Sequence, residues 1–77
     1  MSFAVVWHRP ALFTLRELPM HTAMVVDRAI LRFAETGTGH LEWDPPYHRL
    51  RAGLHDAVLT IDTEARKLTV LRIYRMR

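Results

Sequence analysis

The segment Tyr47-His48-Arg49-Leu50-Arg51 carries residue types that can bind a nucleic-acid backbone. Its alternation predicts a β-strand, in which side chains two positions apart share a face at a spacing of about 7 Å. Tyr47, Arg49 and Arg51 then line one face, and Leu50 points the other way. An aromatic ring followed by two guanidinium groups suits stacked bases and bidentate phosphate contacts. The alternative, that these arginines form the solvated face of an edge strand, stays open at this point.

Positive charge is concentrated in the second half of the chain. Residues 1–46 hold four arginines and five acidic residues, a net charge of −1, whereas residues 47–77 hold six arginines and one lysine against three acidic residues, a net charge of +4. This asymmetry favours a polyanionic partner such as nucleic acid. Besides the first segment, the candidate nucleic-acid contacts are Arg72, Arg75 and Arg77.

Histidines are the candidate acids and bases in this half. His40, His48 and His55 lie in or near it, and an imidazole titrates near neutral pH. The other interpretation, that they are surface or structural histidines, stays open too. Their spacing does not match a metal site, and no cofactor motif occurs, so we predict neither a metal nor a cofactor.

Length and composition predict one domain over residues 1–77, with 49% hydrophobic residues and no cysteine. The longest apolar run, from Phe3 to Trp7, is too short for a membrane span and follows no basic region of a signal peptide. A cytoplasmic location is the resulting expectation.

The elements that position these residues follow from periodicity. Residues 3–7 read as a strand, and Pro10 is suited to the first turn of a helix that Pro19 ends. A second helix carries its apolar stripe at three- and four-residue spacing, and Gly37 caps it. A loop over 37–46, with His40 and Trp43, then leads into strands near 47–53, 57–62 and 67–73.

This order predicts an α+β domain with an N-terminal strand, a two-helix hairpin and an antiparallel three-strand meander, the helices packing on one face of the sheet. Because the chain ends on a strand, we also expect an exposed edge that a partner strand covers.

In this order the predicted strands, helices and motifs resemble those of the RelE/ParE-type toxins of bacterial type II toxin–antitoxin modules. The segment Tyr47-His48-Arg49-Leu50-Arg51-Ala52-Gly53 is similar to the family's Tyr-Arg-Leu-Arg-Val-Gly strand and turn, and residues 69–73 are similar to its final Thr-Val-Leu-Arg-Ile strand. Residues 3–10 and 11–36 resemble its first strand and helical hairpin. The resemblance covers nearly the whole chain.

The resemblance implies one of two activities. RelE-like members cleave mRNA in the ribosome without a metal, using basic side chains to position the phosphate and stabilise its charge. ParE-like members share the fold and inhibit DNA gyrase. An inactive member that binds only its antitoxin is a third possibility. Members of both kinds are neutralised by a cognate antitoxin, so the partners it implies are an antitoxin with either ribosome and mRNA or gyrase.

Carried over by residue, the nuclease site would comprise Arg49, Arg51 and Arg75, with His48 as a candidate acid or base. The sequence departs from the family at two positions: Asp56 stands where an arginine is common, and Met76 replaces a second one. A carboxylate at position 56 would repel phosphate and offset the field of a neighbouring arginine.

Overall fold

Prolines and a glycine set the limits of the two helices, as predicted. In the computed structural model, which describes residues 2–76, strand β1 (Ala4–Trp7) leads into α1 (Arg9–Glu17) with Pro10 in its first turn. Helix α2 (Met20–Thr36) follows, with Pro19 at its N-cap. It ends at Gly37, whose left-handed backbone (φ +75°) lets its N–H donate to the Phe33 carbonyl at 2.8 Å. Within residues 2–76, no helix is both long and apolar enough to cross a membrane.

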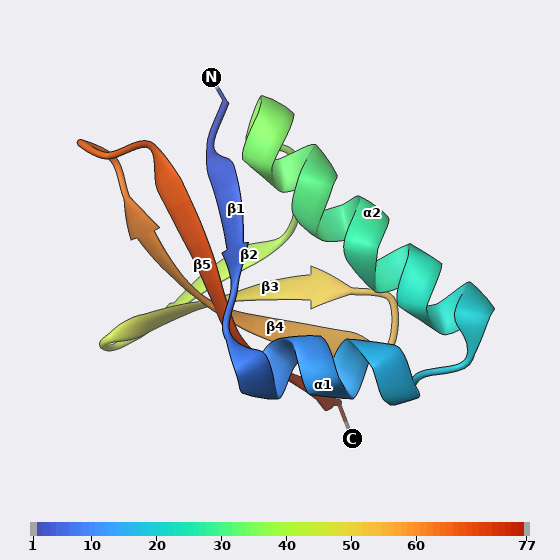
Figure 1. The fold of residues 1–77 in the computed structure, drawn as a ribbon. Coiled ribbons are helices and arrows are strands. Elements are labelled where there is room, and N and C mark those ends of the chain that lie inside the picture. Colours follow the sequence, from blue (N-terminus) through green and yellow to red (C-terminus); the bar gives the residue numbers. More distant parts are fainter. Residues whose placement is uncertain (1, 77) are drawn as a thin grey trace.

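The remaining strands form one sheet with β1 (Figure 1). They are β2 (Leu41–Asp44), β3 (Tyr47–Ala52), β4 (His55–Asp62) and β5 (Lys67–Arg75). The order across the sheet is β1-β5-β4-β3-β2; β1 runs parallel to β5, and the other neighbours are antiparallel. The predicted α+β class is confirmed, with one more strand in the meander than expected.

Both helices lie on one face of the sheet, which we call the inner face (Figure 1). The core forms between them from apolar side chains of α2 and alternate side chains of the strands, and it includes Val26, Ile30, Phe33, Leu50, Ala57, Leu59, Leu68 and Val70. Burial of Leu50 while its neighbours Arg49 and Arg51 remain accessible confirms the predicted alternation in β3. On the opposite, outer face, the part of the chain that the structure describes places no helix.

The predicted loop over residues 37–46 was wrong in part, because it contains β2. Leu41 lies opposite Leu50 and Glu42 opposite Arg49, so one cross-strand pair is apolar and the next is charged. Trp43 packs against His48 with ring centroids 4.8 Å apart and ring planes tilted by 49°. Such pairs stabilise a ladder although the short run Leu-Glu-Trp-Asp has little strand signal of its own.

The last strand is not at the outer edge of the sheet, since β5 lies between β1 and β4. However, β1 pairs only with Lys67–Val70. Within the described residues, the β1 side of β5 beyond Val70 therefore has no strand partner. Helix α1, which directly follows β1, also packs against β5, so the exposed edge expected for this strand stays a prediction.

Gly53, at the β3–β4 turn, has a left-handed backbone (φ +65°), and a Cβ there would lie 3.0 Å from Val25 Cγ1 on α2. Gly37 has a similar φ, but a Cβ there would meet no atom within 4 Å. We expect Gly37→Ala to lower the free energy of unfolding by about 1 kcal/mol through backbone strain alone. Gly53→Ala should cost more, because the Val25 side chain on α2 must also shift to admit the new methyl group; urea denaturation of both variants measures the difference. Equal losses would contradict this close approach.

Candidate functional site on the outer face

Three adjacent strands bring two arginines and three carboxylates together on the outer face. Cross-strand register places Glu42 of β2 opposite Arg49 of β3, and Arg51 of β3 opposite Asp56 of β4. Asp44 shares a face with Glu42, two residues along β2. We call Glu42, Asp44, Arg49, Arg51 and Asp56 the arginine–carboxylate cluster.

Arg49 contacts all three carboxylates of the cluster. Its Nη2 donates to Glu42 Oε1 at 3.3 Å and its Nη1 to Asp56 Oδ2 at 3.5 Å. Its Nε lies 3.3 Å from Asp44 Oδ2 as an ion pair without hydrogen-bond alignment. The guanidinium is thus surrounded by intramolecular acceptors on several sides.

Asp56 is the buried member of the cluster. Its side chain is 6% exposed, compared with 49% for Glu42 and 62% for Asp44. One carboxylate oxygen faces Arg49, and the other lies 3.5 Å from Arg51 Nε. A buried carboxylate is stable only when charge and hydrogen bonds compensate its lost hydration, and here two arginines provide this compensation.

Tyr74 joins the cluster from β5, where it lies opposite Asp56. The neighbouring Tyr74 side chain raises the pKa of Arg49, the charges of Asp44 and Glu42 add to this, and desolvation acts in the opposite direction.

The cluster carries two positive and three negative groups, since Arg49 and Arg51 face Glu42, Asp44 and Asp56. An approaching phosphate would meet these carboxylates as well as the arginines. To bind Arg49 bidentately it would have to displace acceptors already in place, at a cost in like-charge repulsion.

The structure gathers some predicted site residues and separates others. Tyr47, Arg49, Arg51 and Arg72 share the outer face, Arg72 through its pairing with Val58 beside Arg49. Arg75 pairs with His55 on the inner face, and His48 packs on Trp43 there. Arg77 lies outside the described residues. The combined site of Arg49, Arg51, Arg75 and His48 is thus not assembled at one place, and the catalytic roles of the last two stay predictions without support from geometry.

Alternation along β5 causes this separation, because it places Arg72 and Tyr74 on the outer face and Arg75 on the inner face. Sequence reasoning missed Tyr74, Glu42 and Asp44 as members of the site. Tyr74 was detectable from that alternation. The two β2 carboxylates were not, because β2 itself was expected to be a loop.

No protein-family model matches the chain, and no curated protein does. Two solved structures are similar over almost its full length. A chain of the archaeal RelE–RelB complex from Pyrococcus horikoshii OT3 matches with a TM-score of 0.79 at 12% identity, covering 97% of this chain and 96% of that one. A chain of the toxin–antitoxin complex RelBE2 from Mycobacterium tuberculosis matches with a TM-score of 0.70 at 19% identity, covering 97% and 99%.

This chain has their fold. The likeness extends through both helices and all five strands, with almost no part of either chain left over. At these identities it says nothing of the side chains on the outer face, so the cluster must be interpreted from its own geometry.

Asp56→Asn tests the buried carboxylate. The substitution removes the charge that holds both arginines and leaves a buried amide, so we expect the free energy of unfolding to fall by about 1–3 kcal/mol. Glu64→Gln is the matched control, because Glu64 is exposed and has no ion pair with the described residues; it should change stability by less than about 0.5 kcal/mol. Urea denaturation checks both, and equal stabilities would show that Asp56 does not hold the cluster.

Proposed function

We propose that this protein is the toxin component of a type II toxin–antitoxin module and acts in the cytoplasm. The observation that carries the proposal is the shared fold: two structures that are toxin–antitoxin complexes contain chains that match this one from end to end. The order of motifs between Tyr47 and Ile73, which resembles RelE/ParE-type toxins, supports the same assignment independently of the backbone likeness.

The proposed partner is a cognate antitoxin. The similar structures are described as complexes of toxin with antitoxin, which supports this choice. Among the described residues no strand pairs with Leu71–Arg75 on the β1 side of β5, so an extended antitoxin segment could add there as a strand, beside the α1 helix that packs on β5. A folded chain of this size, with several large apolar side chains exposed, also gains stability from a partner that covers them.

The first candidate activity is ribosome-dependent, metal-free cleavage of mRNA. Arg49 and Arg51 would stabilise the charge that develops on the phosphate, and Tyr47 would stack on a base. In this reaction the nucleophile would be a 2′-hydroxyl of the nucleic acid itself. Since only RNA carries this group, the substrate would be RNA. The obstacle is local, because Asp56 contacts both arginines and Glu42 and Asp44 contact one of them.

The second candidate activity is inhibition by binding a protein, with DNA gyrase as the target that the resemblance suggests. The charge balance of the cluster favours it. Mixed charges flanked by Tyr47 and Tyr74, each 41% exposed, suit a protein surface better than a polyanion. We therefore place binding ahead of cleavage as the mode of toxicity.

Induced expression tests the toxin assignment. We expect growth to stop after induction, and co-expression of a short acidic reading frame adjacent to this gene to restore it. Colony counts and optical density after induction measure both effects. Unimpaired growth at a confirmed protein level would contradict a toxic role and leave an inactive member of the fold.

The two candidate activities, mRNA cleavage and inhibition of gyrase, can be distinguished in the same arrested cells. We expect primer extension to show intact reporter mRNA, and Arg49→Ala with Arg51→Ala not to create or remove any cut. Plasmid topology, followed in parallel, should show loss of supercoiling if gyrase is the target. Codon-spaced cuts in mRNA that disappear in the double variant would instead establish cleavage through this arginine pair.

A further inference from the structure

A pocket of about 260 Å³ opens on the inner face of the sheet, whereas the arginine–carboxylate cluster lies on the outer face. It lies between the first half of α2 and the turn from β3 to β4. His21, Thr22 and Val25 line it from α2, Leu54 from the turn, and His55 and Arg75 from the paired ends of β4 and β5. Four elements of the fold thus contribute to it.

Two polar groups of this pocket, His55 and Arg75, have no charged or hydrogen-bonding partner at the described residues. His55 is 8% exposed, and its Nδ1 is buried with no hydrogen-bond partner. Arg75 makes no ion pair with the described residues, in contrast to Arg49. Among residues 2–76, none that lines the pocket is acidic. A buried polar atom without a partner is costly unless a ligand supplies one.

The start of α2 adds to the positive potential. Pro19 at the N-cap gives no side-chain hydrogen bond to the free N–H groups, and the first turn contains no acidic residue. Neither a side-chain cap nor an acidic residue of the first turn therefore compensates the positive end of the helix dipole. His21 and Thr22 belong to this first turn. Together with His55 and Arg75 they form an environment for an anion.

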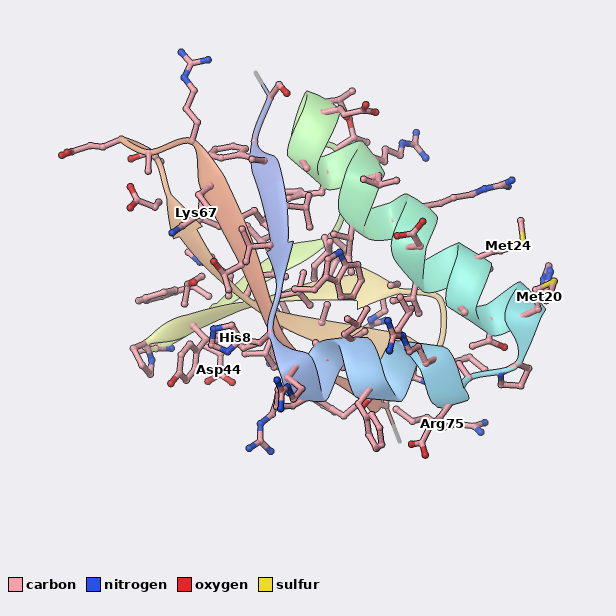
Figure 2. The ribbon with its side chains drawn as sticks, viewed as in Figure 1. His8, Met20, Met24, Asp44, Lys67 and Arg75 are labelled. Carbon is pink, nitrogen blue, oxygen red and sulfur yellow. The ribbon has the colours of Figure 1, made fainter. Side chains whose placement is uncertain are left out.

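The rim of the pocket is apolar, and the neighbouring hollow on α2 contains Met20 and Met24 beside a single carboxylate, Asp27; both features limit the class of anion. Val25 is 37% exposed and Leu54 is 66% exposed at the rim of the pocket. On the adjacent ridge of α2, Met20 and Met24 are 81% and 44% exposed, and Figure 2 shows both extending away from the ribbon. A bare or sugar-linked phosphate would leave these side chains uncovered. A carboxylate with apolar neighbours would cover them and reach Arg75 at the same time.

We propose that this pocket binds a peptide carboxylate, an acidic side chain flanked by apolar residues on a partner segment that lies along α2. The carboxylate accepts from Arg75 and from His55, and the flanking side chains contact Leu54, Met20 and Met24. The inference rests on the proposed function only in naming the antitoxin as the protein that supplies this segment. The binding chemistry itself depends on the pocket alone.

Two-dimensional ¹⁵N NMR of the full chain tests the pocket with defined probes. N-acetyl-Leu-Glu-Leu-amide should shift the amide signals of Val25, Leu54, His55 and Arg75 saturably. The otherwise identical Gln peptide, which lacks the charge, should bind about tenfold more weakly, and so should the Glu peptide to Arg75→Gln. Arg66→Gln, an exposed arginine at the β4–β5 turn, is the control and should bind the Glu peptide as the wild type does.

Three outcomes would overturn the proposal. Equal binding of the Glu and Gln peptides would show an apolar groove without carboxylate recognition. Unchanged binding to Arg75→Gln would remove the guanidinium from the site. Tighter binding of inorganic phosphate than of the Glu peptide at the same amides would make it a phosphate site. Because the measurement uses purified protein, its result is independent of whether expression arrests growth.

Discussion

A single buried carboxylate determines what the outer face of this protein can do. Asp56 is almost inaccessible, and it lies between the two arginines that would otherwise be the natural phosphate ligands. Burial of the Asp56 carboxylate requires the positive charge of both arginines, and both guanidinium groups in turn contact this carboxylate. Glu42 and Asp44 complete the enclosure of Arg49. The strand register of β2, β3 and β4 fixes all these partners, so the pairing of these strands determines that Arg49 and Arg51 are neutralised.

The two faces of the sheet therefore differ in electrostatic character although both contain arginine. On the outer face the guanidinium groups already have intramolecular partners. On the inner face, Arg75 and His55 lie in a pocket that no acidic residue lines. The net charge of +3 for the whole chain conceals this difference. Available positive charge, rather than total positive charge, indicates where an anionic group of a partner can bind.

Much of the fold was predictable because its signals are local. Pro10, Pro19 and Gly37 act through their own backbone preferences, and the apolar period of α2 reflects a single packed face. The alternation around Leu50 likewise predicted which face of β3 is buried. Strand β2 was missed because its stability comes from residues opposite it in β3, and a pairing of this kind leaves no local pattern.

The site was only partly predictable, for a related reason. Tyr47, Arg49 and Arg51 were correctly placed on one face, and Asp56 was recognised as opposing a phosphate. That Asp56 touches both arginines, and that Glu42 and Asp44 join it, depends on register between strands. Arg75 was grouped with Arg49 and Arg51 through the family resemblance, whereas alternation along β5 places it on the inner face.

The central claim is that the carboxylates, and above all Asp56, keep Arg49 and Arg51 from acting as a phosphate clamp. The salt dependence of binding to a short single-stranded RNA tests it most directly, since the slope counts the phosphates that are neutralised. We expect the same slope for the wild type and for Arg49→Ala with Arg51→Ala. A slope whose magnitude falls by about 0.7 for each arginine removed would show that both arginines contact phosphate, against the neutralisation by Asp56.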